Sequence, residues 1–478
     1  MGVLWRTETL LDRFNEEDGM ALIVSLMVAF VILMLSSVIV AQSIHSLNAS
    51  GYDRQRLTSY NAAEAGVNAW WEDLQTTNLA SLTCTDKAGV MNTAPNEAQY
   101  SAAATFYAAD ATTTMTCPFT SANPPSFVRI LSTGSSEGEA AREVEAFGQL
   151  TPVRTGFGAA IMAVNGTTFN NSFTVYGSSG NNGDIYILNG NLSISNSPTV
   201  YGNVYVPTGS ATLTGNNSEI KGDLWANGTV TVNNPAVVTG NAKSTAGNIS
   251  GSGTVTGDVT ALGTTTVSSV GGSRYPGTNP GPVPTQTFPQ ITNATTAWTN
   301  AGYTLVGPFT GASACTNAYN YIHNTGSGTW ATSGLTNIVI QISATCTFQN
   351  GNNDTNTIRG NLAVLSDGGF TFSQQSNWKG VSAPVKNVYF ISGYTAAACT
   401  GTKNITVGNN TNFDAYTNVF FYTPCTANMN NTNNFAGQVL AANVTIGNQF
   451  TMTFQPVLVP AQGTVTGFTQ DIAYIREV

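Results

Sequence analysis

The sequence predicts an α+β protein with a long N-terminal transmembrane and stalk α-helix, then a small β head, then a large parallel β-helix, or solenoid. Three observations predict this order. Residues 20–41 form an uncharged apolar run, residues 127–152 hold two strand-like runs, and a glycine-led motif recurs from residue 183 onward. The 478 residues also exceed what one hydrophobic core usually contains, which indicates several domains.

The composition is unusually poor in charge. Only 9% of the residues are charged, whereas about 25% is usual in globular proteins. Such a polar sequence is compatible with disorder or with a repetitive β architecture, and the regular recurrence of Val, Ile, Leu, Phe and Tyr favours the second. The net charge is −9 and no run of Lys or Arg occurs, so the sequence predicts no nucleic-acid partner.

The apolar run of residues 20–41 reads MALIVSLMVAFVILMLSSVIVA. It has about the length that a helix needs to cross a bilayer, roughly 20 residues. No convincing small-x-small cleavage site follows it, which favours a retained helix over a signal peptide. The flanking arginines do not choose an orientation, so the cysteines and the low charge of the following chain are our reasons for placing that chain outside the cytoplasm.

Helical periodicity continues beyond the membrane run. Leu57, Tyr60, Val67, Trp71 and Leu74 recur at steps of three, four or seven residues, which extends the predicted helix over residues 20–75. A plain anchor with a stalk is the simplest interpretation. Small residues between these positions would let another helix approach closely. The predicted helix-packing residues are Ala62, Ala63, Glu64, Ala65 and Gly66.

These N-terminal features together resemble a known family. Asp18-Gly19 followed by Met20 and the apolar run, then Ala62-Ala63-Glu64-Ala65-Gly66, is similar to the start of type IV minor pilins and pseudopilins. The resemblance covers about residues 15–75. It implies that residues 1–19 are a cytoplasmic prepilin-type leader, which a prepilin peptidase removes after Gly19 before it methylates the amine of Met20.

The same resemblance implies partners and a location. The chain would cross the cytoplasmic membrane of a bacterium once before assembly and would then reach the cell surface or a pilus. There its helix would pack on other pilin or minor pilin subunits. Major pilins usually carry a glutamate five residues after the cut, and here that residue is Val24, which argues for a minor subunit.

Residues 76–155 are expected to form a small pilin-like head. The strand-like runs at 127–131 and 144–150 are separated by turn residues and charges. They predict a β-hairpin that packs on the helix.

Residues 156–267 carry an internal repeat, in which glycine and Asp or Asn precede an aliphatic residue. Its successive glycines are 19, 20, 18 and 17 residues apart. A period near 20 with short strands is typical of a solenoid, although an antiparallel β-sandwich is an alternative. The copies are Gly183-Asp184-Ile185, Gly202-Asn203-Val204, Gly222-Asp223-Leu224, Gly240-Asn241-Ala242 and Gly257-Asp258-Val259.

A Pro/Gly-rich stretch interrupts the repeat over residues 268–300. Its prolines do not suit a central strand, so it is either a linker or an extended segment lying across the coil. Residues 301–478 are predicted to be a second β-helical region, because Gly360-Asn361-Leu362 and Gly437-Gln438-Val439 resume the motif. This half resembles the polymer-forming β-helical domains fused behind pilin-like N-termini in bacterial surface proteins.

The six cysteines fall in three neighbouring couples. We predict disulfides Cys84–Cys117, Cys315–Cys346 and Cys399–Cys425, with loops of the second β-helical region closed by the last two. Reduced, buried thiols are the alternative. No CxxC pair occurs and the chain has two histidines, so we expect no metal site and no cofactor.

No catalytic motif stands out, and His323 is isolated from any Ser-His-Asp order. Asp184, Asp223 and Asp258 follow repeat glycines, where turn chemistry through their own backbone is favoured over a calcium or substrate ladder. Five aromatic residues of the repeat could bind sugar on an outer face, but the coil interior is the favoured place for them. They are Tyr176, Tyr186, Tyr201, Tyr205 and Trp225.

The predicted function is therefore not enzymatic. The sequence favours a minor pilin-like subunit or pilus-associated adhesin that assembles through its N-terminal helix and presents the solenoid to a surface or a glycan. A membrane-anchored envelope scaffold outside any pilus is the first alternative, and a surface glycan-active enzyme is the second.

Overall fold

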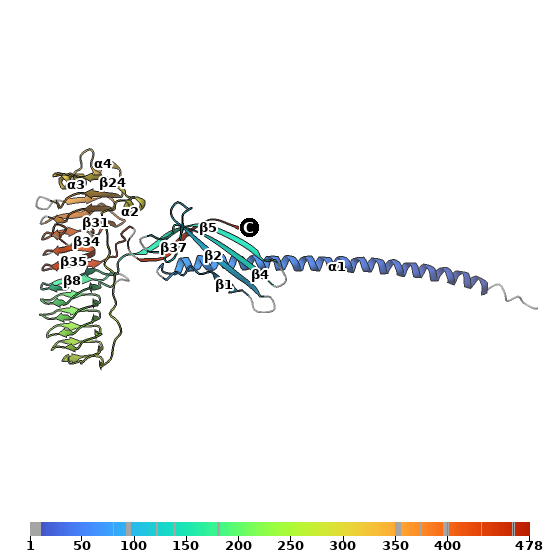
Figure 1. Cartoon of the computed structure of the whole chain (residues 1–478), viewed down its shortest axis with the longest axis horizontal. Helices are drawn as coiled ribbons and strands as arrows, with labels where there is room; N and C mark the ends of the chain where they lie inside the picture. The colour runs from blue at the N-terminus through green and yellow to red at the C-terminus, as the bar shows by residue number, and fades with distance from the viewer. Residues whose placement is uncertain are drawn as a thin grey trace, which may run out of the picture. The chain divides into compact units, whose positions relative to one another are not determined.

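A computed structural model describes residues 11–478 apart from residues 80, 92–96, 121–122, 137–139, 179–181, 349–354, 373–374, 395–398, 400, 432, 461 and 463. The chain forms two compact units (Figure 1). One comprises Met1–Val153 and Thr466–Val478, and the other comprises Arg154–Val465. A long N-terminal helix and a large, mostly parallel β architecture are both present, which confirms the α+β layout.

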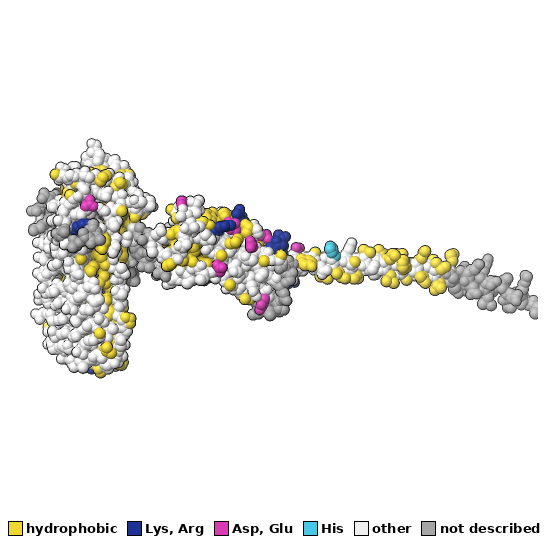
Figure 2. Space-filling view, viewed as in Figure 1, with side chains coloured by type: hydrophobic (Ala, Val, Ile, Leu, Met, Phe, Trp, Pro, Cys, Tyr) yellow, Lys and Arg dark blue, Asp and Glu magenta, His cyan; other side chains and the backbone are white. Residues whose placement is uncertain are grey.

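The first unit begins with helix α1 (Leu11–Thr76). Residues 1–10 of the predicted leader lie outside the described residues, and the helix already includes residues 11–19. The predicted start at residue 20 is therefore too late, because no proline interrupts the acidic leader. Residues 20–57 are exposed, and Figure 2 shows the hydrophobic side chains on this helix.

The head sheet packs on the second half of α1. Its path is β1-β2-β4-β5-β37, with β3 paired to β2. The predicted hairpin is β4 and β5, which pair antiparallel, but it is only part of a larger sheet. The strands are β1 (Lys87–Val90), β2 (Ala98–Tyr107), β3 (Thr114–Met115), β4 (Phe127–Ser136), β5 (Arg142–Thr155) and β37 (Thr464–Glu477).

A buried carboxylate holds three strands of this sheet together. The side chain of Glu145 on β5 is only 4% exposed. It accepts hydrogen bonds from Arg129 Nε at 2.9 Å, Tyr474 O–H at 2.7 Å and Arg476 Nη2 at 3.1 Å. Since Arg129 lies on β4 and the other two donors lie on β37, Glu145 fixes the C-terminal strand to the sheet.

The second unit is a parallel solenoid built from short strands. Neighbouring coils pair in parallel, as β10 pairs with β13 and β12 with β15, so the alternative of an antiparallel sandwich is wrong. In most strands, alternate side chains point into one continuous apolar core.

The first set of solenoid strands runs from the incoming chain to the proline-rich segment. It comprises β6 (Ile161–Ala163), β7 (Thr167–Phe169), β8 (Phe173–Tyr176), β9 (Ile185–Ile187), β10 (Leu192–Ile194), β11 (Thr199–Val200), β12 (Val204–Val206), β13 (Ala211–Leu213), β14 (Glu219–Ile220), β15 (Leu224–Ala226), β16 (Val230–Val232), β17 (Val237–Val238), β18 (Ala242–Ser244), β19 (Ile249–Ser250), β20 (Thr254–Val255), β21 (Val259–Ala261), β22 (Ser269–Val270) and β23 (Arg274–Pro276).

The second set follows the proline-rich segment. It comprises α2 (Thr296–Asn300), β24 (Thr304–Phe309), α3 (Ala314–His323), α4 (Trp330–Ser333), β25 (Ile338–Ile342), β26 (Cys346–Phe348), β27 (Thr355–Ile358), β28 (Leu362–Ser366), β29 (Phe370–Phe372), β30 (Asn377–Gly380), β31 (Lys386–Ser392), β32 (Ile405–Val407), β33 (Asn412–Phe413), β34 (Thr417–Met429), β35 (Asn434–Ile446) and β36 (Phe450–Phe454).

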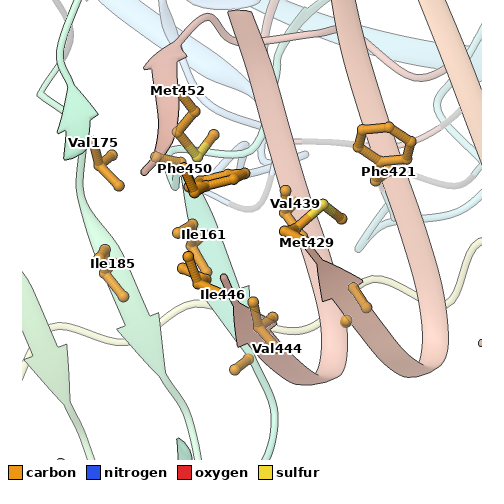
Figure 3. Packing of buried hydrophobic residues seen from close by; sticks show 14 of the residues in the cluster. Ile161, Val175, Ile185, Phe421, Met429, Val439, Val444, Ile446, Phe450 and Met452 are labelled. Carbon is orange, nitrogen blue, oxygen red and sulfur yellow. The ribbon is translucent and has the colours of Figure 1, made fainter. Parts of the chain in front are cut away.

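The chain enters this solenoid in its middle rather than at an end. Strand β35 pairs with β6, and β36 pairs with β8, so the last coil stacks on the first. We call this junction the seam. Figure 3 shows Val439, Phe450 and Met452 of the last coil beside Ile161 and Val175 of the first.

The seam corrects two predicted boundaries. Regions 156–267 and 301–478 are not separate β-helices but two halves of one solenoid, and the first half continues to β23. Residues 466–478 leave the solenoid for the other unit. The repeat motif reports the size of a coil, but it carries no information on the order in which coils stack.

Of the two predicted alternatives, a linker or an extended segment lying across the coil, the proline-rich segment forms the second. We call residues 277–295 the strap. It has no helix or strand and packs on the outside of the coils, where Ile291 is buried. Tyr422 O–H donates to Pro289 O at 2.7 Å, and Thr245 Oγ1 donates to Gly281 O at 2.8 Å. The strap thus covers an apolar outer face while the chain returns from one end of the solenoid to the other.

The repeat motif has a physical explanation at each of its positions. A Cβ on Gly222 would lie 2.5 Å from Gly202 O, so the corner glycine allows close backbone stacking. The next residue bonds the following coil: Asp223 N donates to Asn203 Oδ1 at 2.8 Å, and Asn241 N donates to Asp223 Oδ1 at 2.7 Å. The aliphatic residue enters the core.

Gly222→Ala is expected to lower the free energy of unfolding by about 1–3 kcal/mol, because the new methyl group overlaps the stacked backbone. Denaturant unfolding of the full-length protein measures it. Gly326→Ala is the control, since no heavy atom lies within 4 Å of a Cβ at Gly326. Equal stability of both variants would contradict this account of the corner.

Glu145→Gln is expected to flatten the pH dependence of head stability. Hydrogen bonds from Arg129, then Tyr474 and Arg476, lower the pKa of Glu145 from 4.5 to about 2. A depressed carboxyl pKa contributes stability above the unfolded value, and that contribution is lost as the pH falls from about 5 toward 2. Thermal unfolding across this range should show the loss in the wild type.

The Glu145→Gln variant should be less stable at pH 7 and should lose less on acidification. Glu143→Gln, on the same strand with an exposed side chain, should follow the wild-type profile. An unchanged profile in the Glu145 variant would refute the proposed contribution.

Candidate functional site

Residues 20–57 of α1 form the first candidate surface, and we call them the assembly segment. Met20 is 71% exposed and Val24 is 57% exposed. The helix is long and apolar enough to cross a membrane. Gly19 and Met20, the predicted processing residues, lie within the continuous helix.

The predicted helix-packing residues are largely used inside the chain. Ala62, Ala63 and Gly66 are buried, and a Cβ on Gly66 would lie 2.2 Å from Ser132 Oγ of β4. Their small size therefore admits the head sheet and not a neighbouring helix, which corrects the prediction for these three residues. Glu64 and Ala65 are partly exposed.

The three disulfides join the cysteine couples named from the sequence. Cys84–Cys117 lies in the head unit, where the Cα atoms are 6.2 Å apart. Cys315–Cys346 attaches α3 to β26, and Cys399–Cys425 attaches a loop to β34. Helix α3 buries Ala318 and Ile322 against the core, so the second disulfide fastens a cap on one end of the solenoid.

The repeat aspartates act between coils. Asp223 Oδ1 accepts from the backbone N–H and the side-chain amide of Asn241, and Asp223 Oδ2 accepts from Lys243 Nζ at 2.8 Å. The aspartates were predicted to bond the backbone of their own turn. That prediction is wrong, because their partners lie on the next coil. Burial raises the pKa of Asp184. Among the described residues, no group of three His, Cys, Asp or Glu side chains could hold a metal ion.

His323 lies in the end cap. Its ring stacks on Tyr319 with centroids 5.1 Å apart, and its Nδ1 is 3.2 Å from Asn356 Oδ1. These contacts hold α3 in place. Among the described residues, no repeat aspartate forms a hydrogen bond or an ion pair with His323.

The five repeat aromatics lie outside the interior of the coils, so the favoured interior placement is wrong. Tyr176, Tyr205 and Trp225 take the outward positions of their strands, as Tyr176 follows the inward Val175. Tyr186 and Tyr205 stack with centroids 4.7 Å apart and belong to the apolar cluster that the strap covers. Trp225 Nε1 donates to Thr245 Oγ1 at 3.0 Å.

Tyr176 and Tyr201 form the second candidate surface. Each is 41% exposed, and their rings stack with centroids 4.9 Å apart. Sequence reasoning missed their neighbours Thr451 and Thr453, which the seam places beside Thr174 and Tyr176. The alternating Thr-Met-Thr of β36 indicates an outward polar face, but nothing in the sequence indicates which strand adjoins it.

Comparisons with known proteins add little to this geometry. No protein-family model matches the chain, and no curated protein matches it. Among solved structures, the competence-associated pilin ComZ from Thermus thermophilus is similar at 12% sequence identity, over 88% of this chain and 97% of that chain. The TM-score of this match is 0.28, and so low a score supports no argument on fold or function.

Proposed function

We propose that this chain is a minor pilin-like subunit or pilus-associated adhesin of a bacterium. It is held in the cytoplasmic membrane by the assembly segment before assembly and then packs through that segment on other pilin subunits. Its solenoid contacts a surface or a glycan at the cell surface or on a pilus. The observation that carries the proposal is the apolar, wholly exposed first half of a helix whose second half is seated on the head sheet.

Exposed apolar surface of this extent needs a partner. Removing apolar surface from water stabilises a protein by about 25 cal/mol per Å², and the apolar run of residues 20–41 is exposed throughout in the described part of the chain. Lipid or the helices of other subunits can cover it. The head sheet contacts this segment only near its end, where Ser136 Oγ donates to Gln55 O and Arg56 pairs with Glu477. The apolar run of residues 20–41 can therefore exchange lipid for protein neighbours without a rearrangement of the head.

The repeat carboxylates support a non-catalytic solenoid in this proposal. Both oxygens of Asp223 are engaged, by Asn241 and by Lys243, as expected of a residue that stacks coils. A membrane-anchored envelope scaffold would need the same helix, and the fate of the N-terminus distinguishes it from a pilin-like subunit.

The chain isolated from its native cell is expected to begin at N-methylated Met20, because its start resembles a prepilin. Intact mass and N-terminal sequencing measure this. Gly19→Val should leave the leader in place and remove the protein from sheared pilus fractions. Gly51→Ala, where a new Cβ meets no heavy atom within 4 Å, should be processed normally.

A wild-type chain that starts at Met1 and never enters a pilus fraction would reject the pilin-like role in favour of the scaffold.

A further inference from the structure

The seam creates one outward face from the two ends of the solenoid sequence. Strands β35, β36 and β8 pair side by side, with Asn434 opposite Thr451 and Thr453 opposite Tyr176. Phe435, Met452 and Val175 point into the core, so the alternate residues point outward. The outward residues are Asn434, Ala436, Thr451, Thr453, Thr174 and Tyr176.

The short side chains of Asn434, Ala436, Thr451 and Thr453, which we call the floor, lie beside the longer side chain of Tyr176, which we call the wall. Tyr176 has Tyr201 on one side, at an interplanar angle of 23°, and the next two coils on its other side contribute Thr453 and then Ala436. A phenol ring extends well beyond a threonine or alanine side chain. Among the ring contacts of the described residues, Tyr176 has only the one with Tyr201, so its second face stands above the floor.

The floor and wall differ in chemistry. Thr451, Thr453 and Asn434 offer hydroxyl and carboxamide groups that donate and accept hydrogen bonds, whereas the ring offers an apolar, electron-rich face. Lys221 and Glu219 form an ion pair beyond Tyr201, with Lys221 Nζ 6.0 Å from the Tyr201 ring centroid.

A pyranose ring matches this combination, since its axial C–H groups form an apolar face and its rim carries hydroxyl groups. The floor also repeats from coil to coil at about 4.8 Å, which suits an extended polymer of like units. We propose that Tyr176, with the floor of Thr451, Thr453, Asn434 and Ala436, binds a neutral carbohydrate chain.

The inference rests on the proposed role of the solenoid in surface contact and names its ligand class. The two proposals can fail separately, because processing at Gly19 and entry into a pilus do not depend on Tyr176.

The test is isothermal titration calorimetry of the full-length protein in a detergent without a sugar head group. The probes are hexasaccharides of β-1,4-glucose and β-1,4-N-acetylglucosamine, with hexagalacturonate as the acidic comparison. At least one neutral hexasaccharide is expected to bind. Tyr176→Ala should weaken that binding by about tenfold, which corresponds to about 1.4 kcal/mol, and Tyr176→Phe should retain it because the ring remains.

Thr453→Lys should also abolish binding, since it raises the floor against the ring. Tyr275→Ala is the matched control, because Tyr275 is 45% exposed on the last coil before the strap, far along the stack from β8. It should bind like the wild type, and all variants should keep the wild-type unfolding temperature.

Three results would overturn the inference. They are failure of both neutral hexasaccharides to bind, unchanged binding in Tyr176→Ala, and tighter binding of hexagalacturonate than of either neutral probe.

Discussion

The parallel pairing of the last coil with the first is the constraint on which the solenoid unit depends. It joins residues as distant as Thr167 and Val444, which are 277 positions apart and share a hydrogen bond. Gln438 reinforces the seam: its Nε2 donates to Phe157 O and Ala159 O, and its Oε1 accepts from Val457 N. This one buried amide therefore ties the incoming chain to the outgoing chain.

The seam also explains how one unit is inserted into the other. The chain enters and leaves the solenoid side by side at Gln438. The solenoid can therefore be inserted in the sequence between β5 and β37 while these two strands remain neighbours in the head sheet. Contacts between residues so far apart in sequence form late and slowly. The local ladders of Asp, Asn and Gly allow each half to coil beforehand, since their bonds join adjacent coils only.

Local features were predictable from the sequence because local interactions produce them. The corner motif at Gly222 and Asp223 needs only its own coil and the next, and the apolar run after Met20 needs only its own composition. The outward position of Tyr176 could also have been read from its place after inward Val175. The seam could not be predicted, because an inward residue such as Phe450 would suit any coil of the stack. Its position opposite Phe173 depends on the return of the chain along the strap.

The head shows how one helix can serve two environments. Ala62, Ala63 and Gly66 face the sheet, while Asn61 and Asn68 on the same turns are exposed. A neighbouring subunit would therefore meet apolar side chains over residues 20–41 and exposed amide side chains beyond residue 60. The greater part of any packing energy then lies in the assembly segment, where burial of apolar surface is available. The polar turns contribute mainly to orientation, since their exposed amides gain little from burial but lose much if left unpaired. In the proposed assembly, attachment and orientation would thus fall on different stretches of the same helix.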